Sequence, residues 1–119
     1  MHALVIEDDD AVAEHMQFCL EQLGYSVALA LDGMAALERC KEQMFEWIIC
    51  DLRLPRLNGF SFIRQLRHVS PGVASRIIVI SSMDDTAVKS EAFSAGAESF
   101  LVKPVTAQML QDALNKPQP

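Results

Sequence analysis

Side chains suited to phosphate chemistry follow short apolar runs at widely separated places in the chain. Glu7 and Asp8 come directly after the first run, and Asp51 comes after another. Ser81 and Lys103 follow two further runs. If these runs are parallel strands of one sheet, their carboxyl ends lie at the same edge and the five side chains share one pocket. A trio of carboxylates with a lysine and a hydroxyl is what a divalent cation and a phosphoryl group need.

The hydrophobic pattern predicts the elements that would position this pocket. Short solid apolar runs are typical of strands buried on both faces of a parallel sheet, and they alternate here with segments of helical periodicity. The expected strands are Ala3–Ile6, Ser26–Leu31, Trp47–Cys50, Arg76–Ile80 and Ser99–Val102. The expected helices are Asp10–Leu23, Gly33–Gln43, Gly59–His68, Asp84–Ala95 and Thr106–Asn115. Such strand–helix units with right-handed crossovers predict an α/β fold, a doubly wound five-stranded parallel sheet in a three-layer sandwich.

Single residues mark several of these boundaries. Gly24 and Gly96 stand where a glycine is expected at the C-terminus of a helix. Asp9 or Asp10 can cap the first helix, and Thr106 can cap the last. These signals support the predicted order of elements.

Composition limits the class of protein. The chain has 119 residues, half of them apolar, which suits one domain over residues 1–116 with 117–119 as a terminal tail or the start of a linker. A net charge of −6, from 10 Lys and Arg against 16 Asp and Glu, disfavours direct binding to nucleic acid or an anionic membrane. No leader pattern and no apolar run of about 18 residues is present. The cysteines have no C-x-x-C spacing and lie in apolar segments, which favours packed thiols in a reducing compartment; they are Cys19, Cys40 and Cys50. We therefore expect a cytoplasmic protein.

Taken together, the motifs resemble the receiver domain of bacterial two-component response regulators, the CheY-like superfamily. The similarity covers essentially the whole chain and rests on the segments 5–9, 49–59, 80–82 and 100–104. Each segment alone is a weak signal, but all four in this order at these separations are specific. The resemblance implies a flavodoxin-like strand order of 2-1-3-4-5, with the phosphorylation site at the switch point between the first and third strands.

The resemblance also implies a role for each acidic residue. Asp51 is expected to be the phosphoacceptor, because a carboxylate at a strand end can attack phosphorus and form an acyl phosphate. The expected cofactor is Mg²⁺ or Mn²⁺, held directly by Asp8 and Asp51 and through water by Glu7, with the backbone carbonyl of Arg53 as a further ligand. The alternative for Asp51 is an aspartate that merely begins a turn.

Lys103 and Ser81 are expected to contact phosphoryl oxygens and to share the charge of the transition state with the cation. The Lys103–Pro104 peptide bond is cis in many relatives, and we expect it here. Phe100 matches the aromatic residue that turns inward when the hydroxyl residue moves toward the phosphate, so Ser81 and Phe100 form the expected switch. An ordinary surface phenylalanine on an edge strand is the alternative.

The phosphodonor is expected to dock beside the site. In the first helix, one face is expected to pack on the sheet; its residues are Val12, Met16, Leu20 and Leu23. An outward stripe remains, made of Ala11, His15, Phe18 and Gln22. By resemblance this stripe and Pro104 receive a sensor histidine kinase or a histidine phosphotransfer protein. A single exposed aromatic at position 18 that has no partner is the alternative.

Two departures and three function classes complete the interpretation. Arg53 and Met83 occupy positions over the site that vary among relatives and govern water access. The last helix has no Arg, so dimerisation through that face is not indicated.

A haloacid dehalogenase-type phosphatase would need a second Asp where Arg53 stands. A degenerate receiver that serves only as a protein-interaction module would be expected to lack part of the site. The favoured hypothesis is a phosphorylatable switch rather than a turnover enzyme, with a possible C-terminal effector domain.

Overall fold

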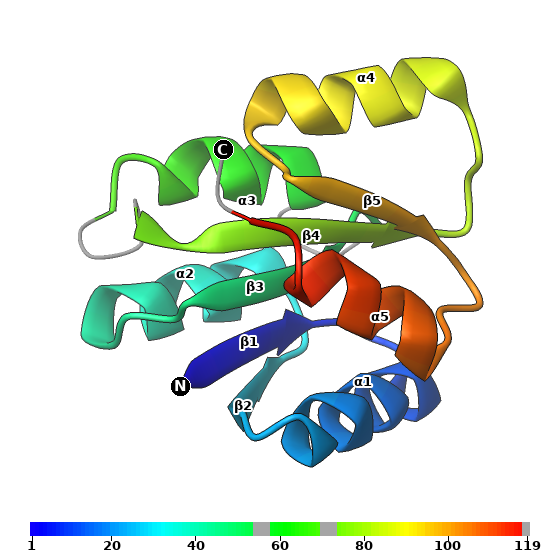
Figure 1. Ribbon diagram of the computed structural model, residues 1–119. Coiled ribbons are helices and arrows are strands. Elements are labelled where there is room, and N and C mark those ends of the chain that lie inside the picture. The colour runs from blue at the N-terminus through cyan, green and yellow to red at the C-terminus, as the bar shows by residue number, and fades with distance from the viewer. Residues whose placement is uncertain (54–57, 70–73, 118–119) are drawn as a thin grey trace.

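The computed structural model describes residues 1–53, 58–69 and 74–117, so positions 54–57 of the motif and positions 118–119 of the expected tail lie outside the described residues. Strands and helices alternate along the chain (Figure 1). The strands are β1 His2–Ile6, β2 Ser26–Ala30, β3 Trp47–Asp51, β4 Arg76–Ser81 and β5 Ser99–Val102. The helices are α1 Asp10–Gln22, α2 Gly33–Glu42, α3 Gly59–Leu66, α4 Thr86–Ala95 and α5 Ala107–Leu114.

All strands are parallel and are ordered β2-β1-β3-β4-β5, so the predicted flavodoxin-like topology is confirmed. Helices α1 and α5 cover one face of the sheet, and α2, α3 and α4 cover the other (Figure 1). The first and third strands are neighbours, although β2 lies between them in sequence. This arrangement places the ends of β1 and β3 side by side at the carboxyl edge, where the chain reverses the direction in which it adds strands.

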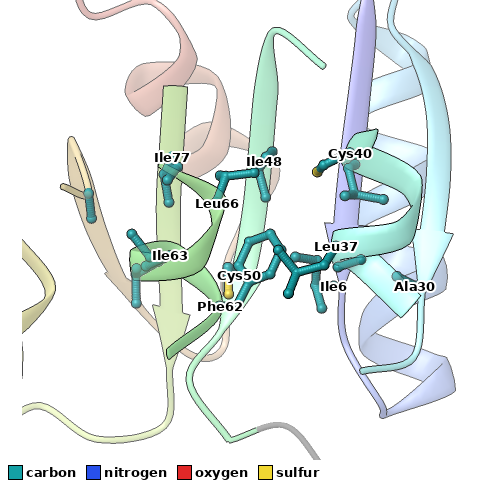
Figure 2. Packing of buried hydrophobic residues seen from close by; sticks show 14 of the residues in the cluster. Ile6, Ala30, Leu37, Cys40, Ile48, Cys50, Phe62, Ile63, Leu66 and Ile77 are labelled. Atoms are coloured by element: carbon teal, nitrogen blue, oxygen red, sulfur yellow. The ribbon is translucent and has the colours of Figure 1, made fainter. Parts of the chain in front are cut away.

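Each face of the sheet has its own core. In β3, Ile48 faces the layer of α2, α3 and α4, and Ile49 faces the layer of α1 and α5. Figure 2 shows part of the first layer, in which Leu37 of α2 and Phe62 of α3 point toward the strands. Ile48 and Ile49 are both fully buried, as expected for a central parallel strand.

The expectation of burial on both faces is wrong for the two edge strands. Most residues of β2 and β5 are only half-buried, because each edge strand has a neighbour on one side only. Leu23 was also assigned wrongly to the inner face of the first helix. It is 39% exposed because it follows the last helical residue, and Ala13 and Cys19 lie on the inner face of α1 instead.

Polar caps define the helix ends. Asp9 caps α1 by accepting hydrogen bonds from the backbone N–H groups of Ala11 and Val12. Helix α4 begins at Thr86 rather than at Asp84, because the Asp85 side chain accepts the first N–H groups of the helix.

The expected cysteine thiols are free and buried. Within the described ranges, no helix has the length and apolar character that a membrane span needs.

Candidate functional site

The carboxyl edge of the sheet brings together residues from four strand ends. Asp51 is the last residue of β3 and Ser81 is the last residue of β4, whereas Glu7 follows β1 and Lys103 follows β5. The backbone N–H of Lys103 donates to the carbonyl of Ser81 at 2.8 Å, which ties the end of β5 to the end of β4. The parallel register therefore places all four side chains at one edge.

Three carboxylates converge at this edge. One oxygen each from Glu7, Asp8 and Asp51 can be chosen so that all three lie within 4.8 Å of one another. Asp51 is 4% exposed and Glu7 is 1% exposed, while Asp8 is open to solvent. Buried carboxylates this close repel one another unless cations lie between them. The edge of the sheet is thus an electronegative pocket with an accessible side at Asp8.

Lys103 supplies one positive charge to this pocket. Its ammonium nitrogen lies 2.9 Å from Asp51 Oδ2 and 2.9 Å from Glu7 Oε2. Burial alone would lower the pKa of this ammonium, but the hydrogen bond to Asp51 and the contact with Glu7 raise it above its usual value. Lys103 is therefore held in its charged form between two carboxylates.

Glu7 is the least satisfied member of the pocket. Its contact with Lys103 lacks hydrogen-bond alignment, and Glu7 Oε2 accepts no hydrogen bond within the described residues. Burial raises the pKa of Glu7 to about 7; the ammonium of Lys103 and the N–H of Asp9 oppose this rise, and the charge of Asp51 adds to it. One ammonium does not neutralise the pocket.

This donor set fits a hard divalent cation. All three side-chain donors are carboxylate oxygens, which Mg²⁺ and Mn²⁺ prefer over nitrogen or sulfur ligands. The charge balance is a second indication, because three clustered carboxylates share the ammonium of Lys103. For Arg53, the contact seen is its backbone N–H, which donates to Asp51 Oδ1 at 3.0 Å. Its carbonyl stays a predicted ligand.

The two expected switch residues lie on neighbouring strands. Ser81 is 1% exposed, and its hydroxyl oxygen accepts the N–H of Met83 at 3.0 Å, which leaves the hydroxyl hydrogen to donate elsewhere. Phe100 is half-buried against the core layer of α4, and the ammonium of Lys89 lies 5.9 Å from the centre of its ring. Phe100 is therefore neither fully inside nor free at the surface.

A glycine requirement beside the acceptor was missed in the sequence. Gly59 begins α3, and a Cβ atom there would lie 2.7 Å from the carbonyl oxygen of Asp51 and 2.8 Å from the Cα of Leu52. The N–H of Gly59 also donates to the carbonyl of Leu52 at 3.1 Å. Any larger residue would push α3 away from the acceptor strand. The only sequence signal was a helix that begins with glycine soon after Asp51.

The expected docking stripe is divided between two depressions. Ala11, His15 and Pro104 border a groove of about 430 Å³ that also reaches Lys103, between α1 and the loop after β5. Phe18 is 60% exposed, as expected, but it lines a separate hollow of about 180 Å³ between α1 and α5. The Lys103–Pro104 bond is cis, as expected.

A family model described as the response regulator receiver domain matches residues 3–115 of the chain. Among curated proteins, the transcriptional regulatory protein ZraR of Escherichia coli is 35% identical over 113 residues, which are 95% of this chain and 25% of that protein. The chain therefore spans about a quarter of the length of this relative.

Two solved structures carry ligands of interest. The receiver domain of sensor histidine kinase PA1611 from Pseudomonas aeruginosa has a magnesium ion in its active-site cleft; it is 30% identical, with a TM-score of 0.86 over 95% of this chain and 93% of that one. A response regulator from Burkholderia pseudomallei has a phosphorylated aspartic acid, a calcium ion and citrate; it is 31% identical, with a TM-score of 0.86 over 97% of this chain and 66% of that one.

Proposed function

The chain belongs to the response regulator receiver domain family, and from this premise we propose that it accepts a phosphoryl group on Asp51 and switches conformation in response. One observation carries the proposal. The buried carboxylate of Asp51 lies 2.9 Å from the ammonium of Lys103, and it clusters with the carboxylates of Glu7 and Asp8, one oxygen of each lying within 4.8 Å of the others. A nucleophile, a cation site and a fixed positive charge therefore meet at one point.

The residues divide the chemistry between them. An oxygen of Asp51 forms a bond to phosphorus while the bond from phosphorus to the donor nitrogen of a phosphohistidine breaks. Lys103 can then place its ammonium against a phosphoryl oxygen, and Ser81 can donate its hydroxyl hydrogen to another. Glu7, Asp8 and Asp51 would hold Mg²⁺ or Mn²⁺. When bound, this cation reduces the repulsion between the carboxylates and the incoming phosphoryl group. The magnesium ion of the PA1611 receiver and the phosphorylated aspartic acid of the Burkholderia protein support these roles.

We propose a signalling switch rather than a turnover enzyme. Phosphorylation would draw Ser81 toward the phosphoryl group and allow Phe100 to rotate inward, which would reshape the face formed by α4, β5 and α5. The half-buried position of Phe100 against the core layer of α4 supports this step.

The proposed phosphodonor is a sensor histidine kinase or a histidine phosphotransfer protein that docks at the groove between α1 and Pro104. The chain matches a quarter of ZraR, which supports an output domain elsewhere in a longer protein. Homodimerisation is not part of the proposal. The free, buried thiols fit the proposed cytoplasmic location.

The direct test is labelling with acetyl phosphate and Mg²⁺. Intact-mass spectrometry should detect one added phosphoryl group, and hydroxylamine should remove it because acyl phosphates are labile to this reagent. Asp51→Asn should gain no mass under the same conditions. No gain in the wild type, or an equal gain in the variant, would overturn the proposal.

A further inference from the structure

The loop that carries Lys103 is fixed on both sides of the lysine. At Lys103 itself, the backbone N–H donates to the carbonyl of Ser81 at 2.8 Å. After it, the carbonyl of Val105 lies 2.8 Å from Nε2 of His15, which comes from α1 at the other end of the chain. Through the second contact, His15 links α1 to the loop that follows β5.

The chemistry of this contact defines the state of the imidazole. A carbonyl oxygen can only accept a hydrogen bond, so Nε2 of His15 must carry the proton that it donates to Val105. The thiol sulfur of Cys19, one turn further along α1, lies 4.0 Å from Nδ1 and 3.9 Å from Nε2. The hydrogen bond to the loop therefore fixes the tautomer of the ring, whereas the thiol, nearly equidistant from both nitrogens, does not distinguish them.

The position of this tie connects it to the phosphorylation site. The Val105 side chain is 5% exposed and packs in the core beside α1 and α5, so the loop cannot shift without disturbing that layer. Lys103 is two residues earlier, and its ammonium must reach both Asp51 and Glu7 at 2.9 Å. Phosphoryl transfer depends on such placement, and a shift of about 1 Å in a reacting group can cost up to about 100-fold in rate.

We propose that His15 is a positioning residue for phosphoryl transfer, because its hydrogen bond to the Val105 carbonyl holds the loop from which Lys103 reaches Asp51. This inference rests on the proposed function of Asp51. It assigns His15 a role different from docking, although His15 also borders the groove expected to receive the phosphodonor protein. A docking residue affects only donors that occupy the groove. A positioning residue affects every donor, including molecules too small to dock.

Acetyl phosphate and phosphoramidate therefore separate the two roles. His15→Phe keeps an aromatic ring and removes the donor, whereas His15→Gln offers an amide N–H at a similar distance from the backbone. Glu14→Ala, an exposed neighbour on the same helix, is the matched control. For each variant, labelling rates with both small donors, Mg²⁺ affinity by calorimetry and the melting temperature would be measured.

Loss of one hydrogen bond should lower the labelling rate of His15→Phe about fivefold with both donors. Mg²⁺ affinity should be unchanged, His15→Gln should recover most of the rate, and Glu14→Ala should match the wild type. In the metal-free protein, the amide resonance of Lys103 should shift in His15→Phe and return in His15→Gln.

Equal labelling rates in the wild type and His15→Phe would overturn the positioning role and leave docking alone. A slow His15→Gln variant would overturn it as well, because a donor would then be present without effect. Absence of labelling in the wild type would instead refute the proposed function, so the two failures are distinguishable.

Discussion

At the amino end of the sheet Arg76 pairs with a single carboxylate, Glu98, at 2.7 Å, whereas at the carboxyl end Lys103 serves both Glu7 and Asp51 at 2.9 Å. The first cluster joins the neighbouring strands β4 and β5, whereas the second joins the ends of β5, β3 and β1 across β4. Both are largely shielded from solvent. They differ in how far their charges are balanced.

The amino-end cluster is satisfied in several directions. The guanidinium of Arg76 lies 4.3 Å from the centre of the Trp47 ring and also donates to the carbonyl of Lys116 at 2.9 Å. Such a network stabilises a fold, and its charges are balanced without a ligand. The carboxyl-end cluster has two carboxylates for one ammonium and an acceptor oxygen on Glu7 that lacks a hydrogen bond within the described residues. The difference teaches that an ion pair by itself does not indicate a functional site. An excess of carboxylates over cations at the carboxyl ends of the strands does.

The first expected effect is on cation binding at the unbalanced end. Asp8→Asn should lower the affinity for Mg²⁺ at least about tenfold, because a carboxylate ligand to a hard cation becomes a neutral amide. Calorimetric titration measures this affinity. Asp112→Asn, an exposed acidic residue on α5, should bind Mg²⁺ as the wild type does. Equal affinity in Asp8→Asn and the wild type would place the cation elsewhere.

The next effect is a pH dependence of stability that comes from Glu7. Because the pKa of Glu7 is raised from 4.5 to about 7 in the folded protein, the folded state binds this proton more tightly than the unfolded chain does. The free energy of unfolding should therefore fall as pH rises from about 4.5 to about 7, by about 1–3 kcal/mol, when no divalent cation is present.

Glu7→Gln should remove this pH dependence and should be more stable than the wild type at pH 8 without divalent cations. Added Mg²⁺ should stabilise the wild type more than the variant, since it binds the folded state. Urea unfolding at pH 5 and pH 8 measures both effects, with Glu14→Gln as an exposed control. A wild type that gains stability between these pH values relative to Glu7→Gln would contradict the assignment.

The smallest effect comes from two buried serines, one at each end of the sheet. Ser81 at the carboxyl end accepts the N–H of Met83, whereas Ser99 at the amino end of β5 has a hydroxyl with no hydrogen-bond partner in the described part of the chain. Ser99→Ala should leave stability unchanged or raise it by up to about 1 kcal/mol. Ser81→Ala should still bind Mg²⁺ but should show weaker chemical-shift changes in α4 and β5 on phosphorylation. Full changes in Ser81→Ala would remove it from the switch.

The carboxyl-end pocket was largely predictable from sequence because one rule connects apolar runs to site residues. Parallel strands end at one edge, so a polar residue after each run must lie near the others, and this rule brings together Glu7, Asp51, Ser81 and Lys103. The burial of the central strands followed from the same runs.

Features that depend on a contact between distant segments could not be predicted in this way. The hydrogen bond from His15 to Val105 and the close approach of Gly59 to Asp51 both depend on how helices sit on the sheet. The start of α4 was also missed, since Asp85 caps the helix and Thr86, rather than the expected Asp84, is its first residue. The helical period misassigned Leu23 because the helix had already ended.

The comparison between the two ends is tested most directly by removing one cation from each. Lys103→Met and Arg76→Met both keep a long aliphatic side chain, and labelling rates with acetyl phosphate and free energies of unfolding would be measured for both in saturating Mg²⁺. Lys103→Met should label about 100-fold more slowly or worse, because a charge that stabilises the transition state is lost. Arg76→Met should lose about 1–3 kcal/mol of stability, because Glu98 and the Lys116 carbonyl lose their donor, and it should label within about twofold of the wild type. Wild-type labelling by Lys103→Met, or equal slowing in a folded Arg76→Met, would contradict the account.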